Sequence, residues 1–217
     1  MSKYLENFDY WDRYYAGSDQ LNGNNRCPSQ FATFVLSEYI QTDNFFDIGC
    51  GNGRDSFFFA AHGKRVVAID ASVVAVNQNS NNGLLNNKLR FEKIDFRNKK
   101  EINYFLGLHK NELHNSVIYS RFFIHAIDFD AQENFIYFCR NSLGPDGVIC
   151  IEFRTNNDTD REKITDDHYR RFVDPVEVGK RFSIAGFENT YLVAGTGYAK
   201  KGKDDAHVAR MIFRRIK

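Results

Sequence analysis

Short apolar runs alternate with longer amphipathic segments through the middle of the chain. Polar residues or glycines bound each run, as is typical of buried parallel strands. The runs are Asn44–Ile48, Arg65–Asp70, Leu89–Ile94, Val117–Tyr119 and Val148–Phe153. The pattern therefore predicts that these segments are strands of one parallel sheet.

Segments with apolar residues at helical spacing separate these runs. The first is Arg54–His62, which Gly63 would end, and the second begins at Ser72, a good N-cap, and runs to about Ser80. Lys99–Leu108 and Ala131–Leu143 have the same character. A strict alternation of strands and helices predicts an α/β fold, in which helices cover both faces of a mostly parallel sheet.

Both ends of the chain depart from this alternation. Asn189–Ala194 and His207–Ile216 are strand-like, and the segment between them, Gly195–Asp205, is too short for a crossover helix. The last strand should therefore pair antiparallel, which gives a seven-stranded sheet. Amphipathic spacing within residues 1–43 predicts an N-terminal helical cap that precedes the α/β core of residues 44–217.

Composition narrows the function classes. The 217 residues include 29 Lys and Arg against 28 Asp and Glu, a formal net charge of +1. Proteins that bind nucleic acid or anionic membranes have a basic excess, so neither is expected as a partner. Charged residues at 26% and hydrophobic residues at 42% are ordinary for a globular protein. The length fits a single domain over residues 1–217.

No apolar run approaches the ~20 residues that span a bilayer. Met1–Tyr10 is polar and aromatic rather than signal-like. The sequence therefore predicts a cytoplasmic protein. The cysteines lack the paired spacing of zinc sites or disulfide frameworks, so no metal is expected. They are Cys27, Cys50, Cys139 and Cys150.

The most informative stretch is Phe45–Asp55, where a strand runs into Gly49, Gly51 and Gly53 and then into a helix. Glycine tolerates a positive φ and has no Cβ, so a ligand can approach the backbone of this turn. The N–H groups at the start of the helix point toward such a ligand. Asp70 ends the next strand, where a carboxylate can accept hydrogen bonds from both hydroxyls of a ribose.

The spacing of the glycines separates two nucleotide-binding families. A dinucleotide fold has G-x-G-x-x-G, whereas this chain has G-x-G-x-G with Asp47 two residues before the first glycine. An acid there repels a pyrophosphate and suits a cation. The pattern resembles class I S-adenosylmethionine (SAM)-dependent methyltransferases from about residue 40 to the end. The resemblance implies a Rossmann-like fold, methyltransferase activity and SAM as cofactor.

The resemblance also implies which residues contact SAM. The loop around Asp47 would hold its amino acid part, Asp70 and Ala71 its ribose, and Asp95 with Phe96 its adenine. Phe96 fits ordinary core packing equally well. In chain order the expected cofactor-binding residues are Tyr14, Asp47, Gly49, Cys50, Gly51, Gly53, Asp70, Ala71, Asp95, Phe96 and Tyr119.

Two stretches narrow the resemblance within the class. Gly51–Ser56 is similar to the loop of thiopurine- and tellurite-type methyltransferases. Tyr10–Tyr15 resembles the opening segment of that group, which lies over the cofactor, so Tyr14 or Tyr15 could make a cation–π contact with the sulfonium. The charges of Arg54 and Asp55 suit either a helix-terminal pair or a cofactor contact.

Cations and histidines gather in the stretches expected beyond the carboxyl ends of the later strands: Tyr119–Asp128, Glu152–Thr155 and His168–Arg171. The predicted substrate-binding residues are Arg154, Tyr169, Arg170 and Arg171. The predicted catalytic residues are His125, His168 and Arg121. A guanidinium fork suits phosphate or carboxylate, which favours an anionic acceptor. Alternatively, the arginines pair with Asp166, Asp167 and Asp174 on a solvated face.

The chemistry of the acceptor remains open at this point. A phosphoryl acceptor needs no base, whereas a sugar hydroxyl needs one, for which His125 or His168 would serve unless they are structural. The stretches Tyr119–Ile127 and His168–Phe172 also look like methyltransferases of bacterial surface-polysaccharide pathways. The leading hypothesis is a SAM-dependent O-methyltransferase for a small anionic or sugar-like molecule. The alternatives are a sulfur or tellurium methyltransferase and a non-catalytic SAM-binding protein.

Overall fold

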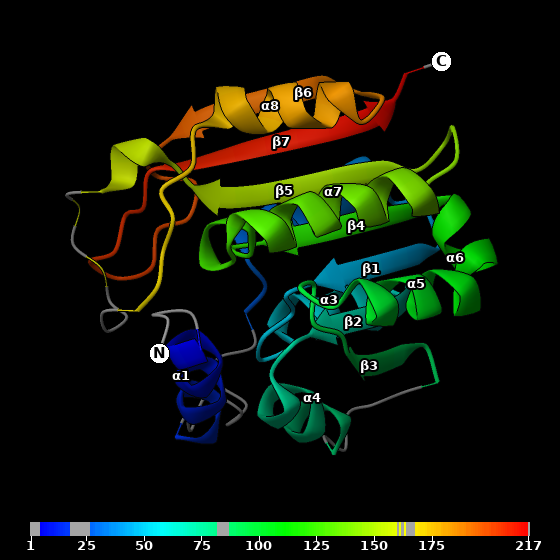
Figure 1. Ribbon diagram of the computed structural model, residues 1–217, viewed down its shortest axis with the longest axis horizontal. Helices are drawn as coiled ribbons and strands as arrows, with labels where there is room; N and C mark the ends of the chain where they lie inside the picture. The colour runs from blue at the N-terminus through cyan, green and yellow to red at the C-terminus, as the bar shows by residue number, and fades with distance from the viewer. Residues whose placement is uncertain are drawn as a thin grey trace.

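The computed structural model describes residues 5–17, 27–81, 87–159, 161, 163 and 168–216. In this part of the chain seven strands form one sheet of order β3-β2-β1-β4-β5-β7-β6 (Figure 1). In this sheet β7 alone runs opposite to the other six strands. The strands are β1 (Asn44–Ile48), β2 (Arg65–Asp70), β3 (Leu89–Lys93), β4 (Ser116–Arg121), β5 (Val148–Arg154), β6 (Phe187–Gly195) and β7 (Val208–Arg215).

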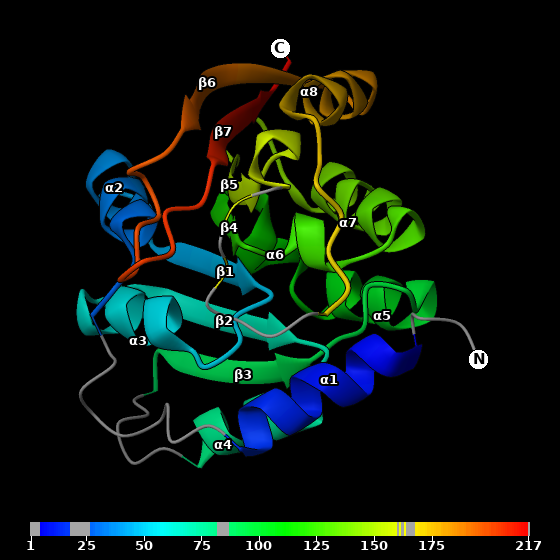
Figure 2. The ribbon, with the colours of Figure 1, turned by 90° about the vertical axis from the view of Figure 1, so that its left-hand side faces the viewer.

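The helices cover both faces of this sheet, as Figure 2 shows in a view onto the carboxyl ends of the parallel strands. The α-helices are α1 (Leu5–Ala16), α2 (Gln30–Glu38), α3 (Arg54–Ala61), α4 (Val73–Ser80), α5 (Lys99–Leu108), α6 (Lys110–His114), α7 (Phe129–Ser142) and α8 (Pro175–Ile184). Two short 3₁₀ helices are η3 (Ile124–Ala126) and η4 (Asn156–Asp158). The predicted seven-stranded α/β fold with a helical cap and an antiparallel last strand is confirmed.

Each face of the sheet has its own apolar core, because successive strand residues point to opposite sides. On one face Phe46, Ile118 and Ile149 are consecutive cross-strand neighbours, and they pack under α5, α7 and α8. On the other face Phe45 and Val117 pack against the residues of α2 and α3. Strands buried on both sides read as unbroken apolar runs, which explains why the sequence pattern located them well.

Two α-helices, α6 and α8, are not predicted by the sequence pattern. The helix α8 begins with Asp174, whose carboxylate accepts from the Val176 N–H at 2.9 Å, and with Pro175 in its first turn. That pairing is a standard start signal, and Val178 and Phe182 then supply buried positions one turn apart. The helix α6 has only five residues, too few for a periodic signal.

The first helix crosses the carboxyl ends of the strands instead of covering a face of the sheet (Figure 2). Two hydrogen bonds join α1 to the α4 region. The Ser72 hydroxyl donates to Asp12, and the Gln78 amide donates to the Tyr15 carbonyl at 3.1 Å. In the described residues no helix has the length and apolar character needed to cross a membrane.

Candidate functional site

A cavity of about 800 Å³ lies where the strand order reverses between β1 and β4. In open α/β sheets this is where ligands bind, because the connecting helices diverge there. Most of the sequence-predicted site residues line it: Tyr14, Asp47, Gly49, Cys50, Gly51, Asp70, Ala71, Asp95, Phe96, Tyr119, Arg121, His125, Arg154, His168 and Arg170. The predicted residues Gly53, Tyr169 and Arg171 do not line it.

The glycine loop has the conformation that its sequence indicates. Gly49, Gly51 and Gly53 have φ values of +74°, +54° and +71°. A Cβ on Gly51 would lie 2.5 Å from the Tyr15 hydroxyl, so α1 can sit directly on the loop only because this residue is glycine. Gly53 stays outside the cavity because it faces Asn79 and Phe91 instead.

The Asp70 carboxylate fixes this loop to the end of β2. One oxygen accepts from the Gly51 N–H at 2.8 Å and the other from the Ser72 N–H at 2.9 Å. Burial raises the pKa of Asp70, while these backbone hydrogen bonds oppose the rise. Because a carboxylate oxygen has more than one lone pair, both oxygens keep acceptor capacity for a ligand in the cavity.

Asp47 is a buried acid at the end of β1, only 3% exposed. The Ser56 hydroxyl donates to it at 2.5 Å. Burial nevertheless raises the pKa of Asp47 to about 8, and the neighbouring carboxylates of Asp55 and Asp70 add to the rise. A cationic group placed beside Asp47 would be needed to keep it ionised at neutral pH.

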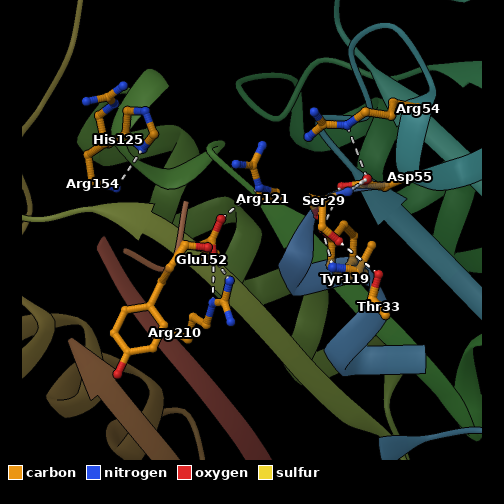
Figure 3. A network of polar contacts seen from close by, with 12 residues as sticks. Ser29, Thr33, Arg54, Asp55, Tyr119, Arg121, His125, Glu152, Arg154 and Arg210 are labelled. Atoms are coloured by element: carbon orange, nitrogen blue, oxygen red, sulfur yellow. Dashed lines mark hydrogen bonds and ion pairs between the residues drawn. The ribbon is translucent and has the colours of Figure 1, made fainter. Parts of the chain in front are cut away.

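A second buried carboxylate, Asp55, joins three elements (Figure 3). It accepts from the Ser29 N–H and hydroxyl, each at 2.8 Å, and from the Tyr119 hydroxyl at 2.7 Å. Burial alone would raise the pKa of Asp55, but the charges of Arg54 and Arg121 and these hydrogen bonds outweigh the effect of burial and lower the pKa. Asp55 thus ties the N-cap of α2 to α3 and β4 as an anion.

The pair after β3 is already engaged with the protein. The Arg97 guanidinium donates to both oxygens of Asp95, at 3.1 and 2.8 Å. The ring of Phe96 packs edge-on against Phe123, Phe135 and Phe138, with centroids 5.4 to 5.8 Å apart. Phe96 therefore both lines the cavity and packs in the apolar core, so the two interpretations that the sequence left open are compatible.

On the other side of the cavity, three charged residues lie opposite one another on adjacent strands. Arg121 of β4, Glu152 of β5 and Arg210 of β7 are register partners. Glu152 is fully buried and accepts from the Nε of each arginine at 2.7 Å (Figure 3). With one carboxylate for two guanidinium groups, this row keeps an excess positive charge, and the terminal nitrogens of Arg121 make no hydrogen bond with a described residue.

Two other predicted arginines are held by the protein. Arg154 donates to Asp158 at 2.6 Å and to Asp204 at 2.5 Å, so its charge is more than balanced. Arg171 turns away from the cavity and donates to the Gln132 side chain. Among the predicted cations, Arg121 and Arg170 also line the cavity. Of the alternative partners, Asp166 and Asp167 lie outside the described residues, and the Asp174 carboxylate accepts from the Val176 N–H at the start of α8.

His125 and His168 both reach the cavity, in different surroundings. The buried His125 accepts the Arg154 backbone N–H at its Nδ1, 3.2 Å away (Figure 3). Burial, and then the charges of Arg154, Arg170, His168 and Arg121, hold its pKa well below the usual value. His168 stacks on Tyr10 of α1, with ring centroids 4.5 Å apart, and lies edge-on to Trp11 at 4.9 Å.

Known proteins share this fold. Residues 46–149 match the family model described as a methyltransferase domain. That match contains the glycine loop, Asp70 and the residues that follow β3 and β4, which are the elements around the cavity. Residues 46–149 therefore form a methyltransferase domain, in a chain with the fold of the SAM-dependent methyltransferases. No curated protein has a matching sequence.

Solved structures of methyltransferases superpose on most of this chain. A SAM-dependent methyltransferase from Anabaena variabilis has a TM-score of 0.70 at 16% identity, covering 95% of this chain and 94% of that one. A TehB-like SAM-dependent methyltransferase from Corynebacterium glutamicum has a TM-score of 0.65 at 14% identity, covering 97% and 98%. The glycopeptide N-methyltransferase MtfA complexed with SAM has a TM-score of 0.65 at 14% identity, covering 86% and 93%. SAM is the cofactor of such enzymes.

Several residues that line the cavity of this methyltransferase are not predicted by any sequence motif. Ser29 and Arg97 follow no motif, and only their hydrogen bonds reveal them. The β6–β7 loop contributes Tyr198–Lys201, which lie far from the other cations in the sequence. The Gly- and Lys-rich composition of Gly195–Asp205 was the available signal, but it served only to predict a hairpin.

Two of the missed contacts hold that loop against the cavity. Arg154 binds Asp204 as described above, and Arg210 donates to the Tyr198 carbonyl at 2.6 Å. The arginines of β5 and β7 thereby position Lys200 and Lys201 at the rim of the methyltransferase cavity.

Proposed function

We propose that this methyltransferase methylates an oxygen atom of a small anionic acceptor, with phosphorylated sugars and carboxylates as the leading class. The observation that carries the proposal is the charge at the far side of the cavity. There Arg121, Arg154, Arg170, Lys200 and Lys201 line the cavity together with one described carboxylate, Asp204, whereas the ion-paired Glu152, Asp158 and Arg210 do not line it. Positive charge concentrated in a concave, partly dry site favours an anion.

The opposite end of the cavity suits the methyl donor. SAM has a positive sulfonium and a positive amino group, and the carboxylates of Asp47, Asp55, Asp70 and Asp95 lie at this end. We assign the ribose hydroxyls to Asp70, whose two oxygens keep acceptor capacity beside the glycine loop. The positive amino group of SAM would keep Asp47 ionised, because a nearby cation favours the charged form of a carboxyl group. The bound sulfonium supplies an electrophilic methyl group with a neutral leaving group.

The protein's part in such a displacement is to align donor and acceptor and to exclude water. The aromatic residues Trp11, Tyr14 and Tyr15 of α1 line the cavity and close it from one side. An aromatic ring also attracts a sulfonium through a cation–π contact, a role that we assign to Tyr14. Arg121 and Arg170 would hold the acceptor, and His125 and His168 lie beside it.

A second candidate is methyl transfer to sulfur or tellurium. It is favoured by the structural likeness to the TehB-like methyltransferase and by the Gly51–Ser56 loop. A soft, weakly solvated acceptor would gain little from a cationic rim. For that reason the charge at the acceptor end supports the anionic class.

The test is a screen for S-adenosylhomocysteine (SAH) release with sugar phosphates, nucleotide sugars, small carboxylates and thiols. We expect turnover with an anionic member and not with neutral thiols. Replacing Lys200 and Lys201 together by alanine should raise the acceptor KM at least about tenfold, since two charge-assisted contacts are lost, and leave SAH affinity unchanged. Lys203→Ala is the matched control, because Lys203 is exposed in the same loop and does not line the cavity. Turnover with thiols alone would favour sulfur over oxygen as the acceptor atom. The absence of SAH binding in calorimetry would contradict the methyltransferase activity itself.

A further inference from the structure

The orientation of His125 limits its proton chemistry. Its Nδ1 faces the backbone N–H of Arg154 at 3.2 Å. A backbone N–H can only donate, so Nδ1 must be the acceptor and a neutral ring must have its proton on Nε2. Nε2 makes no hydrogen bond with a described residue, and His125 lines the cavity. The polar atom that His125 offers to a ligand is therefore an N–H donor.

The surroundings keep this ring neutral. His125 is 4% exposed, and the charged or titratable groups that face it are Arg121 from β4, Arg154 from β5, and His168 and Arg170 from the segment before α8. Burial and these cations all oppose protonation. A neutral imidazole that has its proton on Nε2, and whose surroundings oppose a second proton, cannot remove a proton from an acceptor hydroxyl.

The carboxylates at this end of the cavity are occupied as well. The two oxygens of Glu152 accept from Arg121 and Arg210. Asp158 accepts from the Arg154 guanidinium at 2.6 Å and from the His207 N–H at 2.7 Å, and Asp204 accepts from Arg154. Each carboxylate is paired with a guanidinium, and of the three only Asp204 lines the cavity, with its Oδ2 bound to Arg154.

The remaining histidine has a packing role. His168 stacks on Tyr10 and meets Trp11 edge-on, so its ring joins the segment before α8 to α1. Its approach to an acceptor is limited by these two rings. In the described part of the cavity wall, the acceptor end therefore offers mainly donors and cations, and its one lining carboxylate, Asp204, is paired with Arg154.

We propose, resting on the proposed function, that the oxygen methylated is itself an ionised carboxylate or phosphate oxygen, and that His125 donates its Nε2–H to the acceptor and does not act as a base. A lone pair of the oxyanion forms the new O–C bond to the methyl group. The C–S bond breaks, and its electron pair stays on sulfur, which turns the sulfonium into the neutral thioether of SAH. No proton is released, and the product is a methyl ester with one negative charge fewer than the acceptor.

The decisive experiment counts charge and protons in the wild-type reaction. The acceptor is the sugar phosphate, nucleotide sugar or carboxylate that gives the highest SAH release in the screen above. At pH 7.0, where phosphate monoesters are mostly dianionic, we expect much less than one proton per SAH and a product that elutes earlier from an anion-exchange column. One proton per SAH and an unchanged product charge would show hydroxyl methylation. That result overturns this inference and leaves the anionic acceptor standing, whereas no SAH with any member overturns both.

Variants of His125 test its role separately. The Nε2 amide of His125→Gln reaches about the same place and still donates, so we expect kcat within about tenfold of wild type. His125→Phe lacks the donor and should lose more than tenfold, with SAH affinity confirming that both variants fold. A general base contributes typically 10²–10⁴-fold, so comparable losses of that size in both variants would overturn the donor role. The kcat of the wild type should show no acidic limb between pH 6 and 8, and a limb that His125→Gln removes would also overturn it.

Discussion

At the scale of single residues, the buried Asp47 carboxyl at the cofactor end has a strongly raised pKa. Its pKa of about 8 means that the folded protein without ligand holds a proton there that the unfolded chain releases near pH 4. Between those values the folded state binds more protons, so the unfolding free energy falls as pH rises. The carboxyl group of Asp47, which suits a cationic ligand, thus lowers the unfolding free energy of the ligand-free protein as the pH rises.

Replacing Asp47 by Asn tests this linkage. The amide mimics the protonated acid and still accepts from Ser56, so we expect the Tm of Asp47→Asn to match wild type near pH 4 and to exceed it increasingly up to about pH 8. The measurement is thermal unfolding without ligand across that range. Asp43→Asn is the control, because the Asp43 side chain is 73% exposed and should give a difference that does not vary with pH. Parallel curves for Asp47→Asn would contradict the prediction.

Phe122 is strained by its backbone. It is the one non-glycine residue with a positive φ, +58°, in the described part of the chain. This conformation turns the peptide after β4 so that the Phe122 ring lines the cavity and lies 4.0 Å from the Arg121 guanidinium carbon. Strain of this kind costs about 1–3 kcal/mol and is retained where surrounding contacts impose it.

A pair of substitutions isolates that strain. Phe122→Ala and Phe122→Gly both remove the ring, but only glycine adopts a positive φ without a penalty, so we expect the glycine variant to be more stable by about 1 kcal/mol in urea unfolding. The neighbouring Phe123 has a φ of −95°, and there the order should reverse, with alanine the more stable. The same order at both positions would refute the strain at Phe122.

At the scale of elements, Arg121, Glu152 and Arg210 join β4, β5 and β7 across the point where the sheet changes from parallel to antiparallel. Glu152→Gln leaves two mostly buried guanidinium groups without their anion, which should lower the unfolding free energy by about 3–5 kcal/mol. Glu133→Gln removes a partly exposed partner of Arg181 and should cost less than about 1 kcal/mol. Urea unfolding of the two variants makes the comparison, and equal losses would show that the buried row does not stabilise the sheet.

At the scale of the whole molecule, the cavity is closed by segments from opposite ends of the chain. The contacts of His168 with Tyr10 and Trp11 join the segment before α8 to α1, which itself rests on α4 and the glycine loop. Through these contacts, a ligand at the cofactor end should order the acceptor end.

Hydrogen exchange with and without SAH tests this coupling. We expect SAH to slow amide exchange in both α1 and residues 168–171 of the wild type. In His168→Ala the slowing should persist in α1 and disappear from residues 168–171, because the ring contacts are gone. His62→Ala, an exposed histidine at the end of α3, should behave as wild type. Protection of residues 168–171 in His168→Ala equal to wild type would contradict the coupling.

The local features of this protein were determined by its sequence alone. Strands buried on both faces have unbroken apolar runs, so Asn44–Ile48 and Arg65–Asp70 were predicted with the bounds that the structure has. A positive φ at Gly49, Gly51 and Gly53 needs glycine, so the loop could also be recognised from residue types. These signals arise within a few neighbouring residues, so they can be recognised from the sequence.

Only the tertiary structure decided which charges face the cavity. In the sequence Arg121, Arg154 and Arg171 are equivalent cations, but Arg154 pairs with Asp204, fifty residues away, and Arg171 donates to the neutral amide of Gln132. Folding likewise brings Lys200 and Lys201 to the rim and turns the Nδ1 of His125 to a backbone N–H. A charge or a tautomer is set by partners within a few ångströms, and here those partners come from distant parts of the chain.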